Sequence, residues 1–523
     1  MQERNKDPYN KAFPNESDGS KKLKAKNIVI IVAVIVIAVT ALVLGLVFGL
    51  KKTPPQNIVN MSTQNNSYCF AMKESDESFT IPMSIFEDNP IDAFDIEIRV
   101  IENYIKLENN VVKIVNKLDK NSEIGNSLGE IIFRKNNDTY ITVYMKILRE
   151  EVIEINSLSD FKAIPQGAEG IYLQKNNINL EGQEISIKDF KGEYYGNHNK
   201  LIGLNVSNAG GLFESANDAN LAGINLVNFK YENIDESIEH HSIGLLANTM
   251  TNTNLISIKA NGEILYKNSK INSERVISIG GIVGNLMNES KDNYIEVKGC
   301  QSDVDINVSA SGHAIYIGGL IGNVQNVFIE DVKSFGKINY EFSKEGTQSV
   351  YAGGIAGFLK GKVDGFSGSK IPLDMGWFFE SHMDIKINVE KDSIMFRIGG
   401  IIGKMIDYQL YYVNFAGNIN VDCEKSEVIA GNIAGEVENT VFNKDQKRTI
   451  LISQVTIENP IEVNSDGILK LGSLVGVGIS QYVSNDYGII FSDYPTILAN
   501  VTRKTEIGES KETINKSPIG KRE

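Results

Sequence analysis

YIGGLIGNV, from Tyr316 to Val324, places Gly318, Gly319 and Gly322 around a core of isoleucine and leucine. A glycine-rich stretch of this kind is typical either of a loop that binds phosphate or of a tight structural turn. The number of copies separates the two explanations, because a phosphate-binding loop occurs once, after a single strand.

The stretch recurs along the chain, as GGLFES at Gly210, IGLLAN at Ile243, GGIVGN at Gly280, GGLIGN at Gly318, GGIAGF at Gly353, GGIIGK at Gly399, GNIAGE at Gly431 and GSLVGV at Gly472. The second positions of successive copies lie 33, 37, 38, 35, 46, 32 and 41 residues apart. No copy ends in the Gly-Lys-Ser/Thr of a P-loop. The stretch is therefore predicted to be a structural repeat built on its glycines, which are Gly210, Gly211, Gly244, Gly280, Gly281, Gly318, Gly319, Gly353, Gly354, Gly399, Gly400, Gly431 and Gly472.

Most copies are followed by a second pattern, seen as SIKANGEI at Ser257, VKGCQSDV at Val297, VKSFGKI at Val332 and YVNFAGNI at Tyr412. Apolar residues alternate around it, which is typical of half-buried strands. Each repeat thus supplies short strands joined by tight turns, where glycines can take positive φ angles. Gly319 is predicted to occupy either such a corner or a crowded inner position. One unit cannot bury its apolar side alone, whereas stacked units form a continuous core. The prediction is an all-β fold, a parallel β-helix (β-solenoid) over residues 156–500 with about one repeat per coil.

This pattern resembles the GLUG repeat of bacterial surface proteins, which occurs in adhesin-like proteins and in the non-catalytic parts of IgA-specific metallopeptidases. The lead-in to the repeats is also similar, at Tyr172-Leu173, Ile178-Asn179-Leu180, Phe190-Lys191-Gly192 and Gly196 to Leu204. The resemblance covers residues 155 to about 480, and it departs from the family pattern where Asn432 and Ser473 replace the second glycine. It implies a bacterial, adhesin-like solenoid.

Residues 27–50, NIVIIVAVIVIAVTALVLGLVFGL, carry no charge. At about 1.5 Å per residue, a helix of this length crosses a bilayer core of roughly 30 Å. The alternative, a cleaved secretory signal, would have a shorter apolar stretch and a small-residue cleavage site. Positive charge concentrates in the basic tail 1–26, so the sequence predicts a single-pass signal anchor with a cytoplasmic N-terminus and the bulk of the chain outside the cell. Gly45 and Gly49 form a GxxxG pair, which can bring two spanning helices together.

Three further segments are expected around the solenoid. Residues 51–66 have the composition of a linker. Residues 67–155 contain alternating runs, such as Phe79, Ile81, Met83 and Ile85, that predict a small β-rich, sandwich-like domain with antiparallel strands. Residues 501–523 form a polar C-terminal tail.

The composition narrows the classes of function that the chain can have. The net charge of −14 argues against nucleic acid as the main partner, because phosphate binding needs a basic face. The cysteines, Cys69, Cys300 and Cys423, are too scattered for a disulfide framework or a zinc site. None of the five histidines lies in an HExxH motif. No metal, cofactor or catalytic residue is predicted.

An insertion in the fifth repeat, around SGSKIPLDMGWFFESH, holds the single tryptophan and supplies a candidate binding loop, Trp377, Phe378 and Phe379. The alternative, the more usual one for such aromatic residues, is that they pack onto the solenoid or cap it. The expected function is therefore adhesion, binding or structural display at the cell surface, with a host or neighbouring-cell protein or glycan as partner. The alternative is a carbohydrate-active β-helix, a polysaccharide lyase or hydrolase, which would need carboxylates such as Asp303 and Asp305 gathered from several coils into one cleft.

Overall fold

The computed structural model describes residues 66–87, 89–117, 128–135, 138–149, 151–207, 210–232, 241–268, 275–290, 295–342, 349–361, 375–389, 394–440, 450–459, 461–480, 489–492, 502–503 and 519–522. The predicted basic tail, signal anchor and linker up to residue 65 lie outside these residues, as does most of the C-terminal tail. Among the described helices, none is long and apolar enough to cross a membrane.

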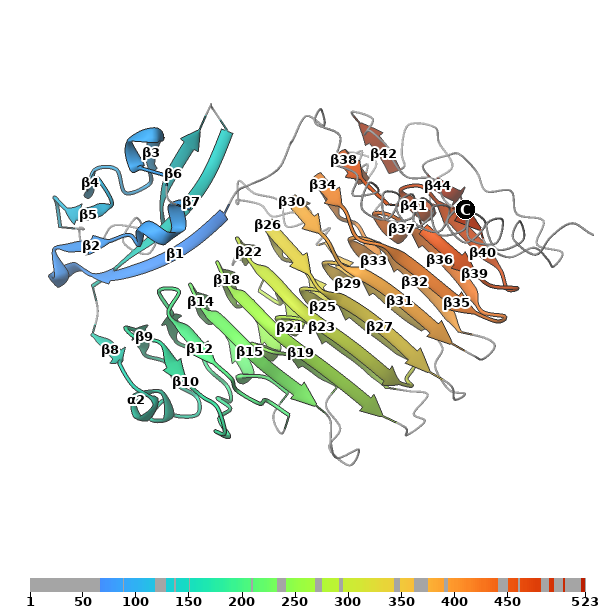
Figure 1. The fold of residues 1–523 in the computed structure, drawn as a ribbon, viewed down its shortest axis with the longest axis horizontal. Coiled ribbons are helices and arrows are strands. Elements are labelled where there is room, and N and C mark those ends of the chain that lie inside the picture. The colour runs from blue at the N-terminus through green and yellow to red at the C-terminus, as the bar shows by residue number, and fades with distance from the viewer. Residues whose placement is uncertain are drawn as a thin grey trace, which may run out of the picture. The chain divides into compact units, whose positions relative to one another are not determined.

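The stretch around Gly318 forms one corner of a coil. β24 (Ala314–Gly318) leads through two residues into β25 (Ile321–Gln325), and β26 (Phe328–Phe335) and β27 (Lys337–Phe342) complete the turn. Strands at the same place in successive coils pair in parallel and in register, so Gly318 lies beside Gly353 of the next coil. Figure 1 shows the coils stacked one after another, from green to orange. This is the predicted solenoid arrangement, with one repeat per coil.

The strands of the coils belong to three parallel sheets. The first contains the strands that end at the glycine corner: β16 (Ser242–Gly244), β20 (Val276–Gly280), β24, β28 (Ser349–Gly353), β32 (Met395–Gly399), β36 (Glu427–Gly431) and β40 (Leu469–Gly472). The second contains the strands that follow this corner: β13 (Phe213–Asn217), β17 (Ala247–Thr251), β21 (Val283–Met287), β25, β29 (Ala356–Lys360), β33 (Ile402–Ile406), β37 (Ala434–Asn439), β41 (Val475–Ser480) and β44 (Ile519–Arg522).

The third and largest sheet receives two strands from most coils, joined by a bend. It contains β8 (Val152–Ile155), β9 (Ile171–Gln174), β10 (Ile178–Asn179), β11 (Glu193–Tyr195), β12 (Lys200–Ile202), β14 (Asn220–Ala222), β15 (Asn225–Glu232), β18 (Asn254–Ile256), β19 (Lys259–Asn268), β22 (Glu296–Lys298), β23 (Gln301–Ala310), β26, β27, β30 (Met375–Ser381), β31 (Asp384–Val389), β34 (Gln409–Phe415), β35 (Ile419–Cys423), β38 (Ile450–Ile457), β39 (Ile461–Asn464), β42 (Ile489–Ser492) and β43 (Thr502–Arg503).

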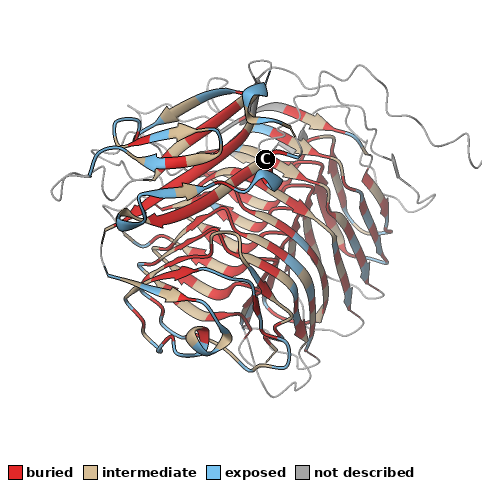
Figure 2. Cartoon of the chain, turned by 60° about the vertical axis from the view of Figure 1, so that its left-hand side comes forward, coloured by how far each residue is buried: buried red, intermediate tan, exposed pale blue. Residues whose placement is uncertain are grey.

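The coils share one continuous hydrophobic core, which extends from Ile155 to Val475. Like residues stack on like: a column of fully buried isoleucines pairs in register from coil to coil, at Ile306, Ile338, Ile385, Ile419 and Ile461. Burial of each such side chain stabilises the fold by about 1.5–3 kcal/mol. Figure 2 shows buried and less buried residues alternating along the stacked strands, as the period-two pattern of the sequence predicts.

The glycines of the corner are needed for space rather than for a positive φ. Among the repeat glycines only Gly210 has a positive φ, at 79°, so the expectation of positive φ was wrong for the others, while the alternative for Gly319, a crowded inner position, is confirmed. A Cβ on Gly318 would lie 1.9 Å from the carbonyl oxygen of Ile321, and a Cβ on Gly319 would lie 2.0 Å from the carbonyl oxygen of Gly354 in the next coil. At Gly318 and Gly319 the backbones therefore lie too close together for a side chain, whereas Leu245, Asn432 and Ser473 occupy the position of Gly319 in other coils.

Residues 66–148 form two small sheets around their own core, which includes Phe70, Val112 and Phe133. β1 (Asn66–Lys73), β7 (Asp138–Leu148), β6 (Gly129–Lys135) and β3 (Asp95–Arg99) make one sheet in this order; β2 (Ser78–Thr80), β5 (Val111–Ile114) and β4 (Ile105–Glu108) make the other. The short helices are η1 (Glu74–Asp76), η2 (Met83–Phe86) and η3 (Ile91–Ala93).

Three features of this small domain differ from the prediction. β1 pairs with β7 in parallel, so the domain is not purely antiparallel. The alternating run from Phe79 does not continue as a strand, because Pro82 cannot donate a ladder hydrogen bond and precedes the helical turn η2. β8, placed in the small domain by the sequence, pairs with β9 of the solenoid.

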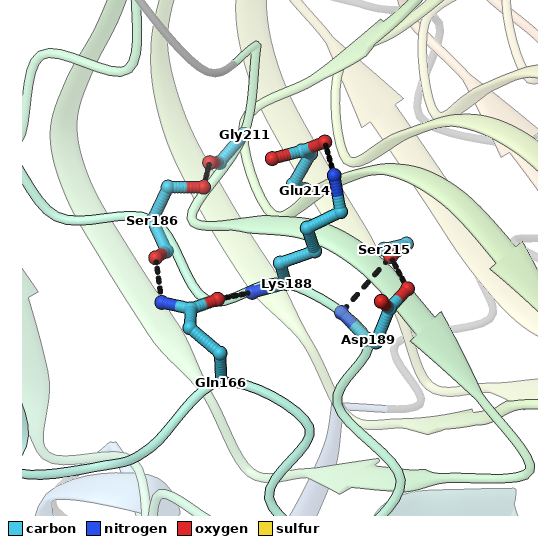
Figure 3. A network of polar contacts seen from close by, with 7 residues as sticks. All are labelled: Gln166, Ser186, Lys188, Asp189, Gly211, Glu214 and Ser215. Atoms are coloured by element: carbon cyan, nitrogen blue, oxygen red, sulfur yellow. Dashed lines mark hydrogen bonds and ion pairs between the residues drawn. The ribbon is translucent and has the colours of Figure 1, made fainter.

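Polar contacts join the first coils. The short helix α2 (Leu158–Lys162) leads to Gln166, whose side-chain amide donates to the carbonyl oxygen of Ser186 at 2.9 Å and accepts from the N–H of Lys188. The Lys188 ammonium in turn lies 2.9 Å from the carboxylate of Glu214 (Figure 3). These groups are largely exposed, so the ion pair contributes little, and the contacts chiefly fix the path of the lead-in.

Candidate functional site

A row of residues in left-handed conformation crosses the third sheet. In each of six coils one residue is left out of the paired register, as Asp331 is between Glu330 and Val332. We call this set the bulge row; it consists of Gly223, Ser257, Gly299, Asp331, Phe378 and Tyr412, with φ angles from 53° to 63°. Because an extra residue interrupts the alternation, each coil presents two consecutive residues on the outer surface at this place.

The first part of the bulge row holds the edge of β1. One edge of β1 pairs with β7, and the other faces side chains of the solenoid. Asn197, which adjoins the row, accepts a hydrogen bond from the N–H of Ala71 at 2.7 Å and donates one to its carbonyl oxygen at 2.9 Å. Ser257 Oγ donates to the carbonyl oxygen of Ser67 at 2.7 Å. Side chains thus satisfy backbone groups that a second strand would otherwise pair.

Glycines of the row let the backbone of β1 come close. A Cβ on Gly223 would lie 2.4 Å from the carbonyl oxygen of Cys69, and a Cβ on Gly299 would lie 2.4 Å from the Cβ of Ser67. Glycine and polar residues therefore alternate along the row, at Gly223, Ser257, Gly299 and Asp331. The glycines supply space and the polar residues supply hydrogen bonds, so together they form a seat for one strand.

Titratable groups at the seam, where β1 contacts the bulge row, are buried, and their pKa values are shifted. Asp331 accepts a hydrogen bond from Ser67 Oγ through Oδ2, while its Oδ1 is buried without a hydrogen-bond partner. Burial raises the pKa of Asp331 to about 6. Burial lowers the pKa of His198 to about 3, and that of Lys259, whose ammonium lies 4.2 Å from the Tyr68 ring centroid, to about 8. Asp331, Lys259, Lys333 and Ser67 line a small cavity at this seam.

Ser257 and His198 lie in the geometry of a nucleophile and its base but are engaged otherwise. Ser257 Oγ is 3.1 Å from His198 Nε2. The Ser257 hydroxyl already donates to Ser67, and His198 Nε2 accepts the backbone N–H of Cys69 at 3.0 Å. Ser257 is also fully buried. The pair therefore serves to dock β1.

Replacement of Asp331 by asparagine is expected to stabilise the protein more at pH 8 than at pH 5. The folded-state pKa of about 6 exceeds the ordinary value of 3.8, so the wild-type protein loses stability as the pH rises between these values. A shift of this size corresponds to ~3 kcal/mol, a cost that the neutral amide avoids above pH 6. Thermal melts of Asp331→Asn and of the exposed control Asp303→Asn at the two pH values measure the effect; a pH-independent difference would contradict it.

The second part of the bulge row is aromatic and uncovered. The Phe378 and Tyr412 rings stack with centroids 4.7 Å apart and an interplanar angle of 22°. Beside them Trp377 and Tyr411 meet edge to face at 6.4 Å. Trp377 is 40% exposed and Tyr412 38%, whereas apolar residues of this size elsewhere in the described coils are mostly buried. We call Trp377, Phe378, Tyr411 and Tyr412 the aromatic patch.

The aromatic patch continues a surface that the small domain covers. The outward column beside the bulge row begins with Leu173, Tyr195, Ala222 and Ile256, which pack against Cys69, Ala71, Tyr144 and Leu148 of the small domain. The same column then carries Lys298 and Glu330, whose charged groups lie 3.5 Å apart, and after them Trp377 and Tyr411. The column is therefore apolar under the domain, charged at its margin and apolar again beyond it.

Polar groups around the aromatic patch are mutually paired. The Tyr411 hydroxyl donates to Gln409 Oε1 at 3.0 Å. Glu380 lies 3.4 Å from the Lys333 ammonium and 2.7 Å from His382 Nε2, and these contacts keep the pKa of Glu380 below its usual value despite burial. The surroundings of the patch thus carry balanced charge and groups that can exchange hydrogen bonds.

The structure places the predicted site residues in different environments. Trp377, Phe378 and Phe379 lie in strand β30 rather than in a loop, and Phe379 is 1% exposed in the core. Asp303 and Asp305 both face outward from β23, where Asp303 meets Asn261 at 3.3 Å. In the described part of the chain no group of three or more His, Cys, Asp or Glu side chains is arranged to hold a metal ion.

Several residues of the site went unnoticed in the sequence. Ser257 and Tyr412 are the first residues of SIKANGEI and YVNFAGNI, Asn197 lies within the lead-in, and Asp331 directly precedes VKSFGKI. None of them stands out in these patterns, because the bulge row alternates in residue type. A positional signal exists for three of them: Ser257, Asp331 and Tyr412 each lie five residues before a glycine of the second pattern, which is Gly262, Gly336 and Gly417 in turn. Neither a family model nor a curated protein matches the chain.

Proposed function

We propose that the protein is a membrane-anchored cell-surface protein whose solenoid carries a binding surface, the aromatic patch, and that it acts in adhesion rather than catalysis. One observation carries this proposal: Trp377 and Tyr412 are exposed on adjacent coils of a rigid sheet, directly beyond a surface that already binds a domain. Exposed aromatic residues on a polar background are typical of contact surfaces.

The alternative, a polysaccharide lyase or hydrolase, receives less support. The strongly perturbed groups, Asp331, His198 and Lys259, lie at the seam and contact β1 or its neighbours. An enzyme of this class would place such groups where a substrate can reach them.

The proposed function predicts that exposed apolar surface at this place matters for attachment. Cells that display the full chain should attach to surfaces coated with glycans or with proteins of neighbouring cells, and the double variant Trp377→Ser, Tyr412→Ser should lose at least about 90% of this attachment, because truncating a hot spot of ~2 kcal/mol lowers affinity some thirtyfold. Val276→Ser, at a similarly exposed residue, is the matched control. Equal attachment by both variants would contradict the role of the patch.

The anchored topology is tested on the same cells. Protease added to intact cells should remove an epitope tag placed at residue 510 and leave one at residue 5 intact, because positive charge before the apolar segment holds the N-terminus inside. Protection of both tags would contradict display at the surface, and the reversed pattern would contradict the orientation.

A further inference from the structure

The aromatic patch offers an extended ligand a path along the stacking direction of the coils. Its residues come from β30 and β34, which are adjacent in the third sheet. Trp377 also meets Phe328 of the preceding coil edge to face, at 6.1 Å, so neither neighbouring ring lies parallel against the indole. Rings on successive coils repeat at about the strand spacing of 4.8 Å. A polymer with one apolar surface per unit can therefore contact several rings in a line.

The bulge row itself distinguishes between a peptide and another polymer. Where it holds the peptide strand β1, it presents Asn197, Ser257 and Asp331, each of which hydrogen-bonds to β1. At the equivalent places farther along it presents the rings of Phe378 and Tyr412. A strand edge laid on these rings would bury backbone N–H and C=O groups without partners, at a cost of about 1–3 kcal/mol each.

A sugar ring can cover these aromatic rings without the cost that a peptide backbone would incur. One face of a pyranose is formed largely by C–H groups, which carry partial positive charge and are attracted to the negative face of an aromatic ring. Its hydroxyl groups point outward around the rim, where Gln409, Glu380 and His382 lie near the patch. A ligand of this kind covers the rings without burying an unpaired polar group.

Charge selects among sugars. Among the residues that the structure describes, Lys298 and Lys333 carry ammonium groups near the patch, and both are engaged with carboxylates at 3.1–3.5 Å. The chain as a whole has a net charge of −14. An acidic polysaccharide would meet repulsion and find its counter-charges occupied, so the surroundings favour a neutral one.

We infer that the aromatic patch is a binding site for a neutral polysaccharide, which lies along the coils with a sugar face on Trp377 and a further unit in contact with Tyr412. This inference rests on the proposed binding function and adds the chemical class of the ligand. The full chain in detergent would be tested by affinity electrophoresis against soluble β-glucan, starch, mannan and galactan, with polygalacturonate as the acidic comparison. Retardation by at least one neutral polysaccharide is expected, with weaker or no retardation by polygalacturonate.

Variants make the test specific. Trp377→Ala and Tyr412→Ala should each weaken retardation at least about tenfold, the factor that ~1.4 kcal/mol gives, whereas Val276→Ala and Asp303→Asn should leave it unchanged. Absence of retardation by all four neutral polysaccharides, or retardation that survives Trp377→Ala, would overturn the inference. Attachment of cells to a protein-coated surface that Trp377→Ala abolishes, without any retardation by polysaccharide, would overturn the sugar assignment alone and leave the proposed adhesive function standing.

Discussion

Gly319→Val is expected to destabilise the protein by more than about 3 kcal/mol, enough to lower the melting temperature markedly or prevent folding. Gly319 has no positive φ, so the whole effect comes from crowding: a Cβ there would lie 2.0 Å from the carbonyl oxygen of Gly354 and 3.0 Å from the side chain of Met383. The obstacle at 2.0 Å is backbone, which can yield only if two coils move apart. Such a movement would open the continuous core at that point.

Gly182→Ala is the matched control, since it tests conformation without crowding. Gly182 has a φ of 68° and no atom within 4 Å of the added Cβ, so alanine there should cost only ~1 kcal/mol. Gly319→Ala should already exceed this cost. Chemical denaturation of the three variants provides the comparison, and a Gly319→Ala variant as stable as Gly182→Ala would refute the account of the corner.

Gly223→Val is expected to detach β1 from the solenoid, which will expose the thiol of Cys69. The added side chain would push on the carbonyl oxygen of Cys69 at 2.4 Å, and valine is poorly suited to the φ of 60° at this place. Cys69 is 1% exposed in the docked state, and burial raises the pKa of its thiol well above the usual range. Labelling of Cys69 should therefore accelerate about a hundredfold, the factor that ~3 kcal/mol of opening gives.

The measurement is alkylation of the native protein followed by peptide mass spectrometry. Cys423, buried in β35 of the solenoid, serves as the internal reference for global unfolding. Gly203→Val provides the control for backbone strain, because Gly203 has a φ of 76° but lies near Glu181 rather than β1. Asn197→Ala, which removes two hydrogen bonds to Ala71, should give a smaller acceleration. Labelling of Cys69 and Cys423 at equal rates in Gly223→Val would show unfolding instead of undocking.

The repeat glycines predicted the coils because the first position of the corner is glycine in every described coil from Gly244 to Gly472, where the backbones approach closely. Their conformation was beyond the sequence, since glycine tolerates a positive φ and a crowded ordinary φ equally well. The sequence also indicated the aromatic cluster around Trp377, but not which of its side chains are exposed. Trp377 faces solvent and Phe379 faces the core, because an unpaired residue, Phe378, shifts the alternation.

The seat for β1 is the part of the site that sequence reasoning could not reach. It brings Ser67 next to Asp331, 264 residues away, and Cys69 next to His198. Contacts between segments so distant in the chain produce no periodic pattern in the sequence. In its local sequence, each polar residue of the bulge row is typical of an ordinary solvent-exposed turn. The docking of the small domain explains why glycine and polar residues alternate along the bulge row.

The glycine corner has the same length in every described coil: two residues separate Gly280 from Val283, Gly318 from Ile321 and Gly431 from Ala434. Connections elsewhere vary, from Ile406 to Gln409 in one coil and from Lys360 to Met375 in another. A gene segment that encodes one whole coil can therefore be duplicated or lost while every remaining strand keeps its register, since the strands of each coil pair with those of the adjacent coils. Proteins that arise in this way would have a solenoid that is longer or shorter in steps of about 4.8 Å, one step for each coil.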